Sequence, residues 1–331
     1  MLKYKILITG TGGCGVGEGL YKSVFNLSCY DIYTCNNSDN SLFIFDNPQK
    51  SFIVPDAFSP EYCKTILKIC IDNNISTVIP GSEQELITLT KNRKLFNKNN
   101  ILIFANTNEV ISTFDNKWNT FIKLNSLGFN TPDSTIDLKD EAFFLRNSFP
   151  LVIKPIYGNA SKNVFIIQTK EEFDCVSKYM SLKNIDFIVQ EYIGSANEEF
   201  TISVLSDFEG QFLGSIILKR KLSAGFSQFI ECFEYEKFNE IAIKISNGIN
   251  SKGPLNIQCR LKNDELYVFE INPRFSGTTP FRTQLGFNEL DVLLKKTYEN
   301  INVFNKNNIK FNYFGVRGFQ EKIYNNNKRL K

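Results

Sequence analysis

Apolar positions recur along the chain with two different spacings, and their alternation predicts a mixed α/β protein. In the first third, short apolar runs of strand character alternate with segments of helical period. We expect strands at 4–9, 30–34, 51–54, 76–80 and 101–105, and helices up to Val24 and at 60–73 and 83–95. This order predicts a parallel, doubly wound sheet, which we assign to a first domain at residues 1–112.

After residue 112 the predicted strands become longer. We expect helices at 115–127, 171–180 and 238–250, and strands at 149–154, 164–168, 187–191 and, as a pair, between Glu199 and Leu218, with a further strand near 311–316. We divide this part into a smaller unit at 113–188 and a larger one at 189–331.

A polar break late in the chain predicts a β-hairpin. Leu255–Lys262 and Leu266–Asn272 flank the three residues 263–265, and a three-residue loop would pair Lys262 with Leu266. Gln258 then lies opposite Glu270. Because side chains alternate along a strand, four oxygen-bearing residues share one face: Asn256, Gln258, Glu270 and Asn272.

These oxygen ligands, followed by Arg274, are typical of a hard-cation and phosphate site. The alternative is a pair of amphipathic strands with a solvated outer face. It is supported by Leu266 and Val268, which lie four and two residues before Glu270 and would therefore place apolar side chains on the same face of the strand.

Composition narrows the classes of function. A net charge of +3 is too small and too dispersed to indicate nucleic-acid binding, and the eight cysteines show neither C-x-x-C nor zinc spacing. We find no secretory segment and no apolar run near the ~20 residues of a membrane span. We therefore expect a cytoplasmic protein with reduced thiols and no nucleic-acid or membrane partner.

Histidine is absent. This excludes Ser-His-Asp and Cys-His triads, histidine–zinc sites and a histidine general base. Phosphoryl transfer fits the remaining residue types, because it depends on positioning and charge neutralisation.

The glycine-rich turn at residues 10–17 follows a predicted strand and precedes a predicted helix. Its G-x-G-x-x-G spacing fits a dinucleotide-binding turn. The acidic residue expected after the second strand is missing, since 34–36 reads Thr-Cys-Asn. A structural tight turn or a substrate-facing loop remains the alternative.

Two further segments carry candidate nucleotide contacts. Lys154 ends a buried strand, and Gly158 and Ser161 follow it in a loop suited to polyphosphate. The alternative is a surface lysine at a strand end.

Gln190–Ile193 and Glu199 place an amide, strand backbone and a carboxylate where adenine and ribose could bind. The alternative is a charged crossover between domains.

The order and spacing of these segments, beginning with Lys117, resemble the ATP-grasp superfamily, and most closely its carbamoyl-phosphate-synthase-like carboxylate–amine ligases. The most specific matches are Gly253-Pro-Leu-Asn-Ile-Gln258 and Glu270-Ile-Asn-Pro-Arg-Phe-Ser-Gly277. The resemblance runs from Ile6 to about Leu294 and includes residues 78–86 of the amino-terminal unit. It implies an α/β and α+β architecture, with a Rossmann-like pre-ATP-grasp domain before a two-lobed ATP-grasp fold.

The resemblance also implies roles for individual residues. Lys117 and Lys154 would grip the ATP phosphates under a loop that contains Gly158 and Ser161. Gln190, Tyr192 and Ile193 would contact adenine, and Glu199 the ribose. Gln258, Glu270 and Asn272 would hold two Mg²⁺ ions, with Mn²⁺ as an alternative metal, and Arg274 would stabilise the transferred phosphoryl group.

The loop departs from the family pattern at Asn163, which often is glycine in relatives, and we expect asparagine to tolerate the left-handed backbone there. Arg220, Arg260 and Arg282 are candidates to clamp a substrate carboxylate. The alternative for each is a surface or structural salt bridge.

The function expected from the resemblance is amide formation between a small carboxylate and an amine through an acyl phosphate. A homodimer is a possible assembly. Three alternatives stay open: a carboxyphosphate-forming enzyme of the carboxylase type, an inert nucleotide-binding protein, and an oxidoreductase using the glycine-rich turn.

Overall fold

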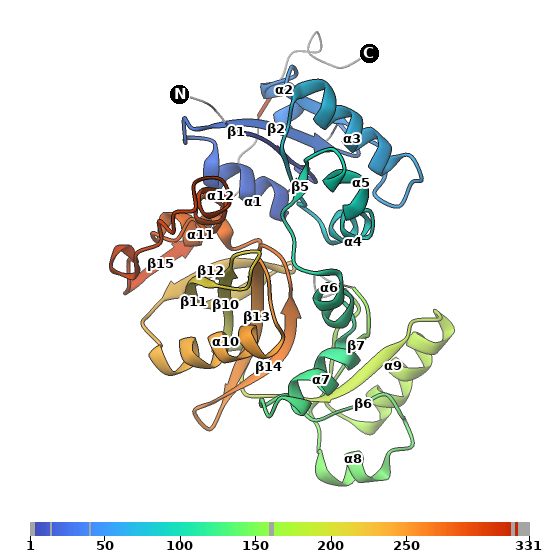
Figure 1. Ribbon diagram of the computed structural model, residues 1–331. Coiled ribbons are helices and arrows are strands. Elements are labelled where there is room, and N and C mark those ends of the chain that lie inside the picture. The colour runs from blue at the N-terminus through green and yellow to red at the C-terminus, as the bar shows by residue number, and fades with distance from the viewer. Residues whose placement is uncertain (1–3, 14, 40, 159–161, 319–321, 324–331) are drawn as a thin grey trace.

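The amino-terminal part of the computed structural model is a five-stranded parallel sheet with helices on both faces (Figure 1). The structure describes residues 4–13, 15–39, 41–158, 162–318 and 322–323. The strand order is β3-β2-β1-β4-β5, so the connections reverse direction between β1 and β4. The strands are β1 (Tyr4–Ile8), β2 (Tyr30–Asn36), β3 (Ser51–Ile53), β4 (Thr77–Ile79) and β5 (Leu102–Ile103). The helices are α1 (Val16–Val24), α2 (Leu42–Asp46), α3 (Tyr62–Asn73), α4 (Glu83–Lys91), α5 (Arg93–Asn97) and α6 (Asn108–Phe114).

Alternate side chains of β1 supply two different cores. Ile6 and Ile8 pack in one cluster with Leu20 of α1, whereas Leu7 packs in another with Ile66 of α3. All three β1 residues are fully buried. A strand buried on both faces is what a sheet covered by helices on both sides requires.

The second part is a four-stranded antiparallel sheet in the order β6-β9-β7-β8. It follows α7 (Lys117–Ser126) and contains β6 (Ser134–Thr135), α8 (Glu141–Arg146), β7 (Leu151–Pro155), β8 (Phe165–Ile167), α9 (Lys170–Leu182) and β9 (Phe187–Glu191). Since β9 pairs with β7 along its whole length, the expected division at 188/189 falls inside a strand of this sheet.

The third part is a six-stranded antiparallel sheet in the order β14-β13-β10-β11-β12-β15. Its elements are β10 (Glu199–Ser206), β11 (Phe212–Ser223), β12 (Phe226–Cys232), α10 (Glu236–Gly248), β13 (Pro254–Lys262), β14 (Glu265–Asn272), α11 (Thr279–Gln284), α12 (Glu289–Glu299) and β15 (Tyr313–Val316), with short 3₁₀ turns at Ala196–Glu198 and Lys306–Asn308. Helix α10 packs on one face through Ala242 and Ile245.

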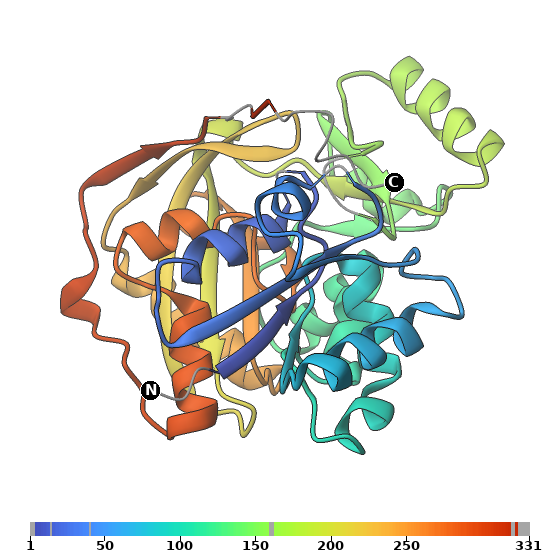
Figure 2. The same ribbon diagram turned by 90° about the horizontal axis from the view of Figure 1, so that it is seen from above.

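The amino-terminal sheet and the six-stranded sheet share a core. Helix α1 lies against α11 and α12 (Figure 2), and Leu20 and Val24 of α1 belong to the same cluster as Leu290 and Leu293 of α12. The four-stranded sheet (green) projects to one side and has its own small core around Phe143 and Ile153 (Figure 1). The helix α7 that precedes this smaller lobe contacts β14, the edge strand of the six-stranded sheet.

Several local expectations differ from the structure. The helix expected at 83–95 is two helices, α4 and α5, interrupted at Asn92. Strand β12 was not predicted, and neither were α2, α6, β6, α8, α11 and α12. Within the described part of the chain, none of the helices combines the length and the apolar character needed to cross a lipid bilayer.

Candidate functional site

The β13–β14 hairpin places the predicted ligand residues opposite one another, by a route different from the one expected. The loop has two residues, Asn263 and Asp264, both with positive φ, and Lys262 pairs with Glu265. The three-residue loop was therefore wrong. A β-bulge that leaves Phe269 unpaired then shifts the register by one residue, so Gln258 lies opposite Glu270 and Asn256 opposite Asn272, as predicted.

The bulge also explains how apolar residues and Glu270, which are separated by even numbers of residues along β14, lie on opposite faces of the sheet. Without it, Leu266 and Val268 would share a face with Glu270. In the structure both are buried in the core beneath the sheet, while Glu270 is half-buried and lines a cavity on the other face. The alternative of two amphipathic strands with a solvated outer face does not describe this hairpin.

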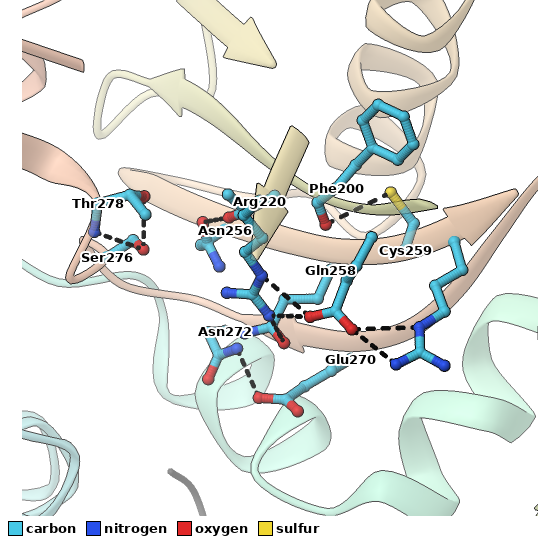
Figure 3. Close-up of polar contacts among 12 residues, drawn as sticks. Phe200, Arg220, Asn256, Gln258, Cys259, Glu270, Asn272, Ser276 and Thr278 are labelled. Carbon is cyan, nitrogen blue, oxygen red and sulfur yellow. Dashed lines mark hydrogen bonds and ion pairs between the residues drawn. The ribbon is translucent and has the colours of Figure 1, made fainter. Parts of the chain in front are cut away.

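Amide and carboxylate oxygens meet on this face of the hairpin (Figure 3). Asn272 donates from Nδ2 to Glu270 Oε1 over 2.8 Å, and Gln258 Oε1 accepts a hydrogen bond from Arg220 Nη2 over 2.8 Å. None of the described residues donates to the second carboxylate oxygen of Glu270. Asn256 is engaged elsewhere, since its Oδ1 accepts from Thr201 and Arg282.

Lys154 reaches the hairpin from the smaller lobe. It lies on β7 and is buried, and its Nζ donates to the carbonyl of the bulge residue Phe269 over 3.3 Å. Burial lowers the pKa of Lys154 to about 8, although the nearby carboxylate of Glu270 acts in the opposite direction. This ammonium is therefore close to the predicted metal ligands and poorly solvated.

Lys117 lies on the first turn of α7 and is also buried. Its Nζ donates to the carbonyl of Gly158 over 2.6 Å, and Gly158 has a φ of +113°, which favours glycine. Asn163 has a φ of 56°, the left-handed conformation expected for it. Ser161 lies outside the described residues.

The end of β9 forms one wall of the cavity. Gln190 is buried and its Nε2 donates to Ser134 Oγ over 2.8 Å, while Ile193 is buried and Tyr192 is half-buried. The Tyr192 ring faces the guanidinium of Arg260 at 5.1 Å. Ser134, which fixes the Gln190 amide, was not identified from the sequence.

Glu199 is held by two arginines. Its Oε1 accepts from Nε and Nη2 of Arg220 at 3.0 and 2.7 Å, and its Oε2 accepts from Nε and Nη2 of Arg260 at 3.1 and 2.8 Å. Burial alone would raise the pKa of Glu199, but the two guanidinium groups hold it below its usual value. The structure thus pairs Glu199, expected at the ribose, with two of the predicted clamp residues.

Arg274 contacts the predicted ligand Asn272 at the junction with the amino-terminal domain. Its Nη2 donates to Asn272 Oδ1 over 3.0 Å and lies 3.5 Å from Glu83 Oε2 of α4. Together with Asn272, Glu83 and Asp115 it lines a second, smaller hollow. Burial and the adjacent Glu83 carboxylate raise the pKa of Asp115 to about 6.

Arg282 is not at the site. Its side chain is fully buried and forms an ion pair with Glu289 at 3.2 Å, and its Nη2 donates to Thr201 and Asn256. The expectation of a substrate-facing guanidinium was wrong for this residue, because its N–H groups bond to the buried residues Glu289, Thr201 and Asn256, which lie outside the lining of the cavity described below. The alternative of a structural salt bridge describes it.

A cavity of about 170 Å³ lies between the smaller lobe and the six-stranded sheet, and its lining does not include Asn272, Arg274 or Arg282. Its lining includes five cationic side chains and three carboxylates: Lys117, Lys154, Lys162, Arg220, Arg260, Glu191, Glu199 and Glu270. Apolar walls come from Val152, Ile166, Leu222 and Phe269. A small anionic ligand with an apolar, planar part fits this lining.

The glycine-rich turn of the amino-terminal domain is packed against its own surroundings. The amide of Gly12 donates to Asn36 Oδ1 over 3.2 Å, and a Cβ on Gly12 would meet that side chain. Gly17 and Gly81 both lie against the carbonyl of Thr9. Close packing accounts for Gly12 and Gly17, while a Cβ on Gly13 would meet no atom within 4 Å. These contacts within the domain favour the alternative of a structural turn.

Comparisons with protein families and with known proteins give matches over most of the chain. A model described as an ATP-grasp domain matches residues 114–278, and one described as the PylC-like N-terminal domain matches residues 30–104. The arginine-specific large chain of carbamoyl phosphate synthase from Halalkalibacterium halodurans is 26% identical over 321 residues, covering 89% of this chain and 30% of that protein. The large chain from Thermoanaerobacter sp. is 26% identical over 306 residues, covering 85% of this chain and 27% of that protein. This chain thus spans about a third or less of these two relatives.

Solved structures share the fold at low identity. The biotin carboxylase domain of the Hydrogenobacter thermophilus 2-oxoglutarate carboxylase, in complex with MgADP and bicarbonate, has a TM-score of 0.71 at 14% identity, covering 95% of this chain and 74% of that one. N5-carboxyaminoimidazole synthetase from Staphylococcus aureus, complexed with ADP, has a TM-score of 0.68 at 15% identity, covering 89% and 77%. An L-amino acid ligase from Bacillus licheniformis has a TM-score of 0.65 at 17% identity, covering 89% and 74%.

Proposed function

This chain belongs to the ATP-grasp superfamily and has a PylC-like amino-terminal domain, and we propose that it is an ATP-dependent carboxylate–amine ligase. The observation that carries the proposal is the cavity that brings together two buried ammonium groups, the end of β9 and the two hairpin residues Gln258 and Glu270. In the proposed reaction, ATP and a carboxylic acid give an acyl phosphate and ADP, and an amine then gives the amide and phosphate.

We assign the polyphosphate to the region between Lys117, Lys154 and Glu270. Both lysines are nine-tenths or more buried and line the cavity, so their charges are poorly screened by water. The strand end at Gln190–Ile193, with the buried Ile193 and the half-buried Tyr192, is the wall we assign to adenine. These positions follow the order in which the superfamily arranges its nucleotide contacts.

The hairpin suits a hard divalent cation. Glu270 offers a carboxylate oxygen that no described residue uses, and the amide oxygens of Gln258 and Asn272 lie on the same face. Among the described residues no three Asp, Glu, His or Cys side chains gather into a metal-binding group, so Glu270 is the only charged member of the ligand set proposed here. When bound, Mg²⁺ would neutralise phosphate charge and polarise the phosphoryl group.

In the proposed reaction the charged side chains of the protein act by stabilising negative charge that develops on the phosphates. A carboxylate oxygen of the substrate attacks the γ-phosphorus and the bond to the β-phosphate oxygen breaks, so that negative charge builds on the departing ADP. Lys154 and Lys117 stabilise that charge from the smaller lobe, and we assign the transferred group to Arg274. The amine then attacks the carbonyl carbon, phosphate leaves with the bonding electrons, and the amine loses a proton.

Carboxyphosphate chemistry on bicarbonate is the second candidate. It is favoured by the structural similarity to a biotin carboxylase domain. At 14% sequence identity, however, that similarity shows a shared fold and not a shared reaction. The two candidates differ in what the cavity must admit beside ATP, bicarbonate in one case and an organic acid with an amine in the other.

ADP release from the purified chain with Mg²⁺-ATP tests the proposal. We expect release to require one member of a panel of amino acids and other small carboxylates together with an amine or ammonia, and the amide to accumulate in equal amount. ADP formation that depends on bicarbonate alone would favour the carboxyphosphate candidate. Tight ATP binding with no ADP release across both panels would leave the inert nucleotide-binding alternative.

A further inference from the structure

The carboxylate of Glu199 is saturated by the chain itself. Each of its two oxygens accepts two N–H groups, from Arg220 on one side and Arg260 on the other. A carboxylate has about four acceptor positions, and these four donors fill them. Glu199 therefore has no acceptor left for a ribose hydroxyl unless an arginine leaves.

Three adjacent strands build this arrangement. Glu199 on β10 pairs directly with Arg260 on β13, and Arg220 lies on β11, the other neighbour of β10. Glu199 and Arg220 are 5% and 8% exposed. Planar, two-donor pairing of a buried guanidinium with a carboxylate fixes the direction in which Arg220 points.

Arg220 points from Glu199 to the metal ligands. The same Nη2 that contacts Glu199 donates a second hydrogen bond. It goes to Gln258 Oε1 over 2.8 Å (Figure 3). Gln258 is one of the two neutral residues of the predicted ligand set, with Asn272, and its amide oxygen is already directed at the positive charge of Arg220. A divalent ion on that oxygen would be repelled by the guanidinium in a cavity that is poorly solvated.

We propose that the guanidinium of Arg220, held in place by Glu199, replaces the second divalent cation at this site, so that the nucleotide is bound with a single metal ion at Glu270. The proposal rests on the proposed function, because it concerns the ATP-binding state of the same cavity. It departs from the two ions that the family resemblance implies. Glu199 is then a positioning residue for Arg220 and not a ribose contact.

Counting metal ions on the nucleotide-bound chain tests this inference without turnover. Mn²⁺ bound per chain is measured by equilibrium dialysis with and without a saturating non-hydrolysable ATP analogue, AMPPNP, and the electron paramagnetic resonance spectrum reports whether two Mn²⁺ ions are coupled. We expect one nucleotide-dependent Mn²⁺ in the unmodified chain, with no coupling. Two coupled ions would overturn the inference.

A pair of matched variants assigns the effect to Arg220. Arg220→Gln removes the charge next to Gln258, and we expect the count to rise from one to two. Arg260→Gln removes the other partner of Glu199, which does not contact Gln258, and we expect the count to stay at one. A count of one in both variants would overturn the role of Arg220, and if Arg220→Gln does not fold, the count for the unmodified chain still decides.

Failure of the proposed function gives a different result. A chain that binds no AMPPNP at any Mn²⁺ concentration would overturn nucleotide binding itself, and with it this inference. A chain that binds AMPPNP with two ions leaves the ligase proposal intact and overturns only the role of Arg220.

Discussion

The ammonium of Lys154 donates a hydrogen bond to the carbonyl of Phe269, over 3.3 Å, across the cavity between the smaller lobe and the six-stranded sheet. Phe269 is the unpaired residue of the bulge in β14, and its ring also lies 5.4 Å from the same ammonium. The irregularity that brings Glu270 opposite Gln258 thus also supplies an acceptor for the lysine we assign to phosphate.

Affinity for nucleotide should fall at alkaline pH. Burial lowers the pKa of Lys154 to about 8, so the free protein loses this charge as the pH rises through that value. We expect the Kd for AMPPNP, measured by titration calorimetry, to increase above pH 8 by up to about tenfold per pH unit. Because the pKa of the folded state lies below the ordinary 10.5, the same group should make folding more stable as the pH rises from 8 to 10.5.

Lys154→Arg is the control for this titration. Arginine keeps its charge over the whole range, so the alkaline weakening should disappear even if the affinity at pH 7 is lower. An unchanged pH profile in the variant would assign the titration to another group.

Glu270→Gln should abolish most turnover while leaving the fold intact. The change removes the carboxylate among the three predicted metal ligands, and we expect ADP formation to fall by roughly 10²–10³. Glu265→Gln is the matched control, since Glu265 is exposed on the same strand at the hairpin turn. Rapid-quench measurement of ADP with the true substrates checks both, and a Glu270→Gln rate near that of the unmodified chain would remove the hairpin from the mechanism.

Arg282 should matter for stability and not for substrate binding. Arg282→Met leaves the fully buried Glu289 without its ion-pair partner, and we expect a loss of about 3–5 kcal/mol in the free energy of unfolding by urea. The double change Arg282→Met with Glu289→Leu should recover much of that loss, because no unpaired charge remains. A folded Arg282→Met variant whose only defect is a raised KM would restore the substrate-clamp assignment.

Gly81→Ala tests the close packing of the amino-terminal sheet. A Cβ at Gly81 would lie 1.9 Å from the carbonyl oxygen of Thr9, and we expect a loss of about 1–3 kcal/mol in stability. Gly277→Ala, where the Cβ would meet no atom within 4 Å, should stay within about 0.5 kcal/mol. Equal unfolding midpoints for the two variants in urea would contradict the packing at Gly81.

Much of the fold follows from local pattern. The alternation of strands and helices from Tyr4 to Ile103 was predicted apart from α2 and the break between α4 and α5, because buried positions recur with the period of each element. The pairing of Gln258 with Glu270 was also predicted, although the reasoning contained two errors that cancelled: the loop is one residue shorter than expected, and Phe269 adds one residue to β14.

Other features were decided only when distant segments met. The sequence determined which residues carry charge, amide oxygen or a tight turn, since these are properties of the residues themselves. It could not show that Arg282 would be buried against Glu289, or that Arg220 would be shared between Glu199 and Gln258. Long side chains end far from their own backbone, so their partners depend on which strands become neighbours, and the tertiary structure alone makes that choice.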